Sequence, residues 1–114
     1  MGLAALAMVG SHFLPGDSSA GAEQIRRGKL AYLDNCAGCH GADLKGSRQG
    51  PPFIHQVYEP SHHGDEAFYR AAVNGVRAHH WRFGDMPPVP GISRDQVGDI
   101  IAYIREQQRQ NGIE

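Results

Sequence analysis

The sequence has only two cysteines, few aromatic residues, no cluster of basic residues and no apolar run of the roughly 20 residues that span a bilayer. Cys36 and Cys39 are too close together for a disulfide scaffold that joins distant segments. Lysine and arginine number 11 against 12 acidic residues, a net charge of −1, and this balance argues against nucleic-acid binding. Aromatic residues make up 8% of a chain of 114 residues. A chain of this length forms one domain, and so modest a core favours a bound cofactor.

Glycine and proline are abundant, with 15 and 7 residues respectively, so much of the chain is predicted to be loop. No alternating β pattern is evident. Three helices are expected. The first covers residues 23–34 and has Ile25, Leu30 and Leu33 as its apolar positions, and the second covers residues 65–74, with acids in its first turn and Gly75 after its end. The third runs from a capping box at 93–96 to about residue 110 and carries an apolar stripe of Val97, Ile100, Ile101 and Ile104. The predicted class is all-α, with long loops around a central group.

The first 22 residues are typical of an export segment. Residues 3–14 are mostly apolar but too few to cross a membrane, and Ala20-Gly21-Ala22 supplies a small-x-small cleavage pattern before Glu23. No basic residue precedes the apolar run, so a membrane-anchor remnant and an ordered segment remain alternatives. We therefore predict a signal peptide or anchor remnant at 1–22, with possible membrane association through residues 1–14, and a domain at 23–114. The domain is expected to be periplasmic.

The segment Cys36-Ala37-Gly38-Cys39-His40 matches C-x-x-C-H, the attachment signature of c-type haem. Two intervening residues let one helical turn present both thiols to the two vinyl groups, and the next residue places its imidazole under the iron. A thioredoxin-type C-x-x-C needs a βαβ context, and a zinc site needs a second Cys or His pair at ribbon spacing. Neither context is predicted here. One covalently attached haem c is therefore the expected cofactor, with Cys36, Cys39 and His40 as its ligating residues.

Residues 23 to about 110 resemble class I cytochromes c, the small monohaem electron carriers. Gly28 and Tyr32 lie eight and four residues before Cys36, where the family has a small residue and an aromatic one. Ile101-Ala102-Tyr103-Ile104 is similar to the family's last helix, whose aromatic side chain packs across that glycine. The resemblance implies the cytochrome c fold, in which three main helices and long loops surround one haem.

The resemblance also implies the residues around the iron. Gly50-Pro51-Pro52-Phe53 is similar to the family's loop after the haem motif, so the Pro51 carbonyl is expected to accept the His40 Nδ1–H and Phe53 to pack on the macrocycle edge. Met86, in the proline-rich loop before the last helix, is the expected sixth ligand, with His79 and His80 as competitors. Three further residues complete the expected cofactor-binding set: Tyr58, Trp81 and Arg82, the last with Arg77 as a candidate partner of a haem propionate.

With both axial positions filled, outer-sphere transfer of one electron is the predicted function, and no catalytic residue is assigned. The expected partners are redox proteins, such as an oxidoreductase, a terminal oxidase or a reductase. One alternative is a haem-based sensor or ligand-binding cytochrome with a labile sixth ligand. Another is a metal-handling protein that uses the histidine-rich loops, which contain His55, His62, His63, His79 and His80.

Overall fold

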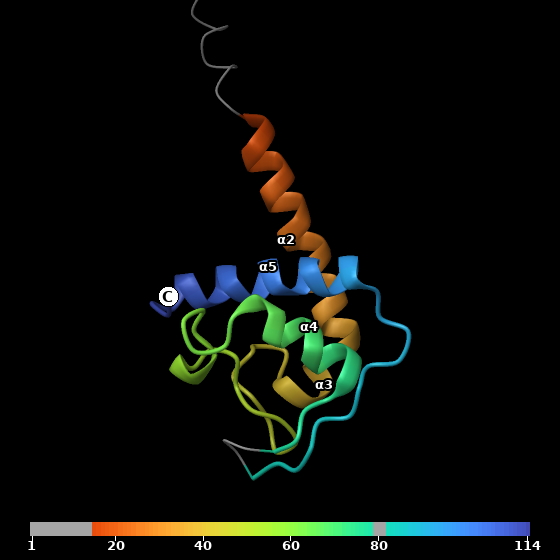
Figure 1. The fold of residues 1–114 in the computed structure, drawn as a ribbon. Coiled ribbons are helices and arrows are strands. Elements are labelled where there is room, and N and C mark those ends of the chain that lie inside the picture. The colour runs from red at the N-terminus through yellow and green to blue at the C-terminus, as the bar shows by residue number, and fades with distance from the viewer. Residues whose placement is uncertain (1–14, 79–81) are drawn as a thin grey trace, which may run out of the picture.

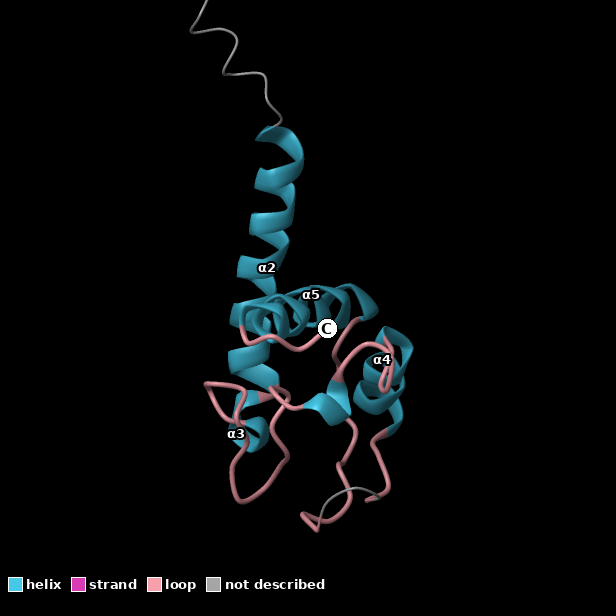
Figure 2. Cartoon of the chain, turned by 90° about the vertical axis from the view of Figure 1, so that its left-hand side faces the viewer, coloured by secondary structure: helices cyan, strands magenta, loops and turns pink. Residues whose placement is uncertain are grey.

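The computed structural model describes residues 15–78 and 82–114, which fold into helices joined by long loops (Figures 1 and 2). The elements are α2 (Pro15–Asn35), α3 (Ala37–His40), the 3-10 turn η1 (Gln56–Tyr58), α4 (Asp65–Asn74) and α5 (Arg94–Gln110). These two ranges contain no strand, only one isolated antiparallel bridge between Val76 and Met86. The predicted all-α class is therefore confirmed. None of the described helices is both long enough and apolar enough to cross a membrane.

The last two helices lie where the sequence predicts them. α4 spans the expected ten residues, and α5 begins directly after Ser93. The Ser93 hydroxyl accepts a hydrogen bond from the Gln96 amide at 3.1 Å, and the Gln96 side chain accepts one from the Ser93 amide at 3.0 Å. This reciprocal pair is the predicted capping box, and it satisfies amides that a helix start leaves without partners.

The first helix is longer than expected, because α2 begins at Pro15 and not at Glu23. Its N-terminal part projects beyond the rest of the domain (Figure 1). We expected the helix to start at residue 23 because the cleavage pattern lies at 20–22. These residues include none that would interrupt a helix running through them from Pro15. Proline is tolerated in the first turn of a helix, and the alanines at 20 and 22 favour helix, so nothing local ends the helix at residue 23. Removal of residues 1–22 stays a prediction.

α2 and α5 cross at Gly28, as the sequence predicts. A Cβ atom placed on Gly28 would lie 1.9 Å from the Asp99 carbonyl oxygen and 3.0 Å from Cβ of Tyr103. Only glycine allows two helix backbones to approach this closely. Beside the crossing, Arg27 forms an ion pair with the Asp99 carboxylate at 3.2 Å. The crossing holds the end of α2, and therefore the attachment motif that follows it, against α5.

The core lies along the inner face of α5. The predicted stripe is buried, since Val97, Ile100, Ile101 and Ile104 all have exposed fractions of 5% or less. Two of the three predicted apolar positions of the first helix are wrong, because Leu30 and Leu33 are 53% and 40% exposed, whereas Ile25 packs against the core. The face of α2 that meets the core runs from Ile25 through Gly28 to Tyr32, which are spaced at helical intervals. The residue of α2 at the contact with α5 is Gly28, whereas the hydrophobic pattern predicts an apolar side chain at such a contact.

Candidate haem site

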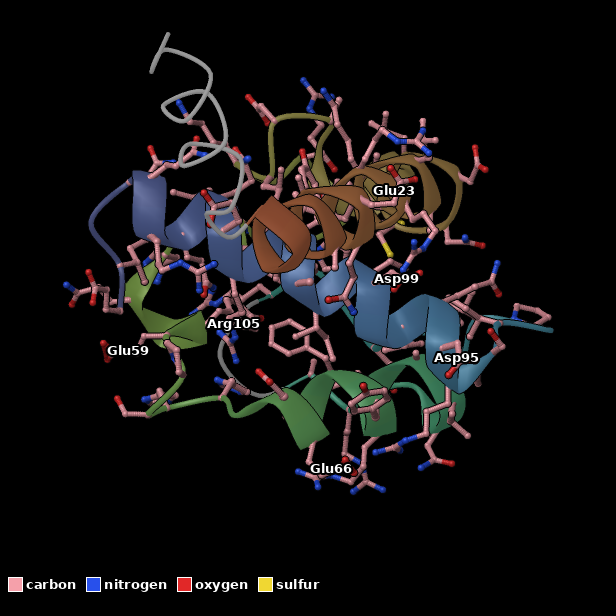
Figure 3. All side chains as sticks on the ribbon, turned by 90° about the horizontal axis from the view of Figure 1, so that it is seen from above. Glu23, Glu59, Glu66, Asp95, Asp99 and Arg105 are labelled. Atoms are coloured by element: carbon pink, nitrogen blue, oxygen red, sulfur yellow. The ribbon has the colours of Figure 1, made fainter. Side chains whose placement is uncertain are left out.

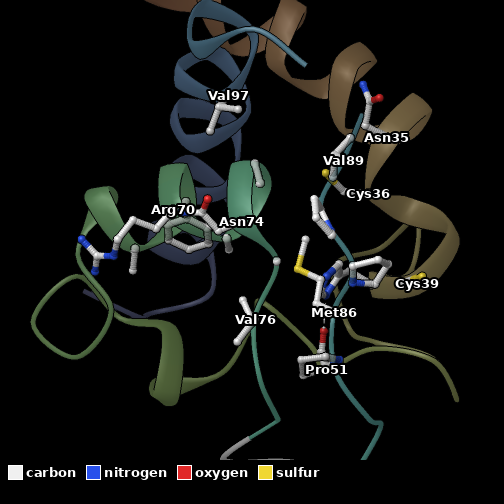
Figure 4. A pocket seen from close by; sticks show the side chains of 18 of the residues that line it. Asn35, Cys36, Cys39, Pro51, Arg70, Asn74, Val76, Met86, Val89 and Val97 are labelled. Carbon is white, nitrogen blue, oxygen red and sulfur yellow. Dashed lines mark hydrogen bonds between the residues drawn. The ribbon is translucent and has the colours of Figure 1, made fainter. Parts of the chain in front are cut away.

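A cavity of about 720 Å³ opens between α3, α4, α5 and the loops that connect them (Figure 4). Apolar side chains form most of its wall, among them Phe68 and Ala71 of α4 and Ile100 and Ile104 of α5. Its volume lies within the range of about 300–1,000 Å³ that is usual for small-molecule and cofactor sites. Seven residues of the predicted set line it: Cys36, Cys39, His40, Pro51, Phe53, Tyr58 and Met86.

The two cysteines reach the cavity because the chain makes one further helical turn after α2 ends. The His40 amide donates to the Cys36 carbonyl at 2.9 Å, which closes this turn. The hydroxyl of the buried Tyr32 donates to the Gly41 carbonyl at 2.6 Å and fixes the end of the turn to α2. Both thiols are free. Burial, and to a lesser extent the neighbouring Cys39, raises the pKa of the Cys36 thiol to about 11, so this sulfur is uncharged at neutral pH and compatible with an apolar wall.

His40 is held in one tautomer by the loop that follows it. Its Nδ1 lies 2.9 Å from the Pro51 carbonyl oxygen, which can only accept, so the ring proton is on Nδ1. Burial lowers the pKa of His40, although the hydrogen bond to Pro51 works in the opposite direction. The imidazole is therefore neutral, and its Nε2 lone pair is available to a metal. The hydrogen bond predicted from the loop motif is present in the structure.

Phe53 contacts the His40 ring, which the sequence did not predict. Its ring stacks on the His40 imidazole, with 4.2 Å between the ring centroids and 24° between the planes. Tyr58 then meets the Phe53 ring edge-on at 5.3 Å. These contacts place an aromatic ring beside His40, as well as on the cavity wall.

Met86 is placed by the isolated bridge, which the sequence did not predict. Its amide donates to the Val76 carbonyl at 2.8 Å, and its carbonyl accepts from the Val76 amide at 2.9 Å. Gly75 makes this approach possible, because it has φ of +75° and a Cβ atom there would lie 2.4 Å from the Met86 carbonyl oxygen. The loop that carries Met86 is thus attached to the end of α4 by main-chain bonds.

The remaining predicted residues differ in their placement. Arg82 is exposed and is not part of the cavity wall, whereas Arg77 and Arg70 are. Arg70 was missed, although it follows the wall residue Ala67 by three positions on α4, so the helical period could have identified it. Trp81 lies outside the described residues.

The histidine-rich loops are only partly described, since His79 and His80 fall outside the described residues. His63 lines the cavity, and its Nδ1 lies 2.6 Å from the Val57 carbonyl oxygen. The His62 and His63 rings stack at 5.0 Å, and the His55 ring accepts a hydrogen bond from the Val57 amide. Within residues 15–78 and 82–114, no three His, Cys, Asp or Glu side chains are grouped so that they could hold a metal ion.

The wall as a whole fits a c-type haem. Two thiols sit on one turn, a neutral imidazole follows them, and a thioether comes from a separate loop into the same apolar cavity. Sulfur and imidazole are ligands that suit haem iron. Arg70 and Arg77 also line the cavity and would supply hydrogen-bond donors to the propionates of a haem.

Comparisons with known proteins agree with this chemistry. The family model described as Cytochrome c matches residues 25–108. The chain is 41% identical over 82 residues to a protein of Rhizobium meliloti (strain 1021) named Cbb3-type cytochrome c oxidase subunit FixP. The matched region is 70% of this chain and 26% of that protein, so the chain spans about a quarter of the relative's length. No solved structure matches the chain significantly.

Proposed function

The chain belongs to the cytochrome c family, and on that premise we propose that it carries single electrons between redox proteins, with His40 and Met86 as the axial ligands of its haem iron. Family membership establishes a covalently bound c-type haem and electron transfer as its chemistry. When bound, the haem supplies an iron that accepts or gives up one electron. The observation that carries the proposal is that His40 and Met86 line the same apolar cavity, each held by main-chain hydrogen bonds.

The protein's own residues would set how readily that iron accepts an electron. The Pro51 carbonyl holds the His40 ring and makes its Nε2 a stronger donor. The thioether of Met86 is a soft ligand that favours the ferrous state of the iron. The apolar wall acts in the same direction, because it disfavours the extra positive charge of the ferric state. If His40 and Met86 both hold the iron, a bound haem would keep no position open to a substrate, so the proposed reaction is outer-sphere.

We propose that the domain works outside the cytoplasm, in the periplasm, and exchanges electrons with a terminal oxidase or another redox protein. The relative in Rhizobium meliloti is named as an oxidase subunit, which favours a partner of that kind. The apolar run at residues 3–14 is compatible with export or membrane attachment. Whether the chain acts alone or within a complex depends on that partner.

A redox titration followed by absorbance, combined with carbon monoxide addition, tests the carrier function. The wild-type protein should give one reversible one-electron transition, and its ferrous form should bind no carbon monoxide. Met86→Ala should bind carbon monoxide, because the substitution opens the sixth position. A wild-type protein with a high-spin ferric spectrum and tight carbon monoxide binding would contradict the carrier proposal and support the ligand-binding alternative.

A further inference from the structure

The inner face of α5 contains a charged side chain in an otherwise apolar row. Arg105 follows Ile101 and Ile104, and only 9% of its side chain is exposed. In Figure 3 it lies between α5 and the segment that leads to α4. Among the described residues its carboxylate partner is Asp65, which lies 3.0 Å away and is 61% exposed. A buried cation with so solvated a counter-ion must obtain most of its hydrogen bonds elsewhere.

Those bonds go to the main chain of the segment before α4. One terminal nitrogen of the guanidinium donates to the Tyr58 carbonyl at 2.6 Å, and the other donates to the His63 carbonyl at 2.6 Å. The central carbon of the guanidinium lies over the Phe68 ring, 4.9 Å from the ring centroid. The rigid fork of donors therefore fixes both ends of the segment 58–63 at once.

Gln108, one turn further along α5, extends the same arrangement. It is fully buried, and its Oε1 accepts from Arg105 at 2.8 Å. Its Nε2 donates to the Phe53 carbonyl at 3.1 Å and to the Tyr58 carbonyl at 2.9 Å. We call Arg105 and Gln108 the α5 clamp. The clamp thus holds the main chain from Phe53 to His63.

The clamped segment forms the wall beside the iron ligand. Phe53 is the residue whose ring stacks on His40, and Tyr58 and His63 line the cavity. Apolar side chains of similar volume would stabilise the core at least as well as a buried guanidinium does. What directed donors add is a defined position for the carbonyls that they hold. The clamp is therefore suited to positioning and not only to stability.

We propose that Arg105, together with Gln108, is a positioning residue for the haem site, which acts on the His40 ring through the Phe53 ring. The proposal rests on the proposed function in that His40 must ligate the iron. The hydrogen bonds of the clamp reach neither the cysteines nor Met86. Loss of the clamp would therefore change the orientation of the His40 ring and leave the set of ligands unchanged.

The test uses the haem-loaded protein and the variant Arg105→Met, with Arg109→Met as the matched control. Arg109 lies on the same helix, but its ion pair with Glu106 is exposed. Amide hydrogen exchange of residues 53–63 should be faster by about tenfold or more in Arg105→Met, since bonds from a charged donor are lost. The hyperfine-shifted haem methyl resonances of the ferric protein, which report the orientation of the axial imidazole, should also change. Arg109→Met should match the wild type in both measurements.

A double-mutant cycle asks whether Arg105 acts through Phe53. In Phe53→Leu the haem methyl pattern should change, and adding Arg105→Met should produce little further change, because the ring that transmits the effect is gone. Should Arg105→Met fail to yield haem-loaded protein, Gln108→Met removes donors to the same segment without removing a charge, and it should change both readouts in the same direction.

Three results would overturn the proposal. The first is a wild-type methyl pattern in Arg105→Met and Gln108→Met, with only the stability lowered. The second is full additivity of Arg105→Met and Phe53→Leu. The third is restoration of the wild-type pattern by Arg105→Lys, which would assign the effect to charge alone. Failure of the underlying electron-carrier proposal is distinguishable, because the wild-type protein would then itself lack the spectrum of a low-spin His/Met haem.

Discussion

Gly28→Ala should destabilise the haem-loaded protein, although alanine is the better helix former. In an isolated helix the substitution would stabilise by about 1 kcal/mol. At the crossing, however, the added Cβ would lie 1.9 Å from the Asp99 carbonyl oxygen and 2.6 Å from the Asp99 carbonyl carbon. Both are backbone atoms, so the two helices must move apart, and overpacking of this kind typically costs about 1–3 kcal/mol. After the gain in helix propensity is subtracted, we expect a net loss of up to about 2 kcal/mol in the free energy of unfolding.

Gly21→Ala, compared in protein that retains residues 1–22, is the matched control, because Gly21 lies on the same helix and a Cβ there meets nothing within 4 Å. Guanidinium unfolding, followed by far-UV circular dichroism, gives the comparison directly. Gly21→Ala should leave the midpoint unchanged or raise it, whereas Gly28→Ala should lower it. A Gly28→Ala protein as stable as Gly21→Ala would refute the close helix crossing.

The other predictions concern the groups that hold the site. Tyr32→Phe should cost about 1–2 kcal/mol of unfolding free energy in the same assay, because the Gly41 carbonyl loses the hydrogen bond that it accepts at 2.6 Å. Gly75→Ala should weaken the sulfur–iron absorbance band of the ferric protein, because the Cβ would collide with the Met86 carbonyl oxygen; an unchanged band would contradict the observed bridge. Ser93→Ala should cost about 1 kcal/mol and Ser93→Asp should restore it, since a carboxylate can accept the same cap hydrogen bond.

The features that could be predicted are those with a local cause. The capping box begins α5 where expected, and the acids at 65 and 66 with Gly75 bound α4. The attachment motif is contiguous, so its chemistry follows from five adjacent residues. Gly28 and Tyr32 could be paired with the last helix because the family resemblance supplied the partner. In each case the information lies within a few residues or within a known motif.

The features that could not be predicted join segments that are distant in the chain. The bridge between Val76 and Met86 and the stacking of Phe53 on His40 depend on how loops without any periodicity fold back. Arg105 and Gln108 were assigned no role from the sequence, although they continue the buried stripe of α5 at helical spacing from Ile101 and Ile104. A search for apolar residues alone does not detect polar residues that lie on the same buried face of the helix.

Proton NMR of the reduced protein tests the central claim, that the iron is held between His40 and Met86. A methionine methyl group bound over a haem lies in the ring current of the porphyrin, so the wild-type spectrum should contain a three-proton resonance far upfield of the protein envelope. Met86→Ala should lack this resonance while retaining the covalently attached haem. A spectrum without the upfield methyl in the wild type, or one that keeps it in Met86→Ala, would contradict the assignment of Met86 and with it the proposed ligand set.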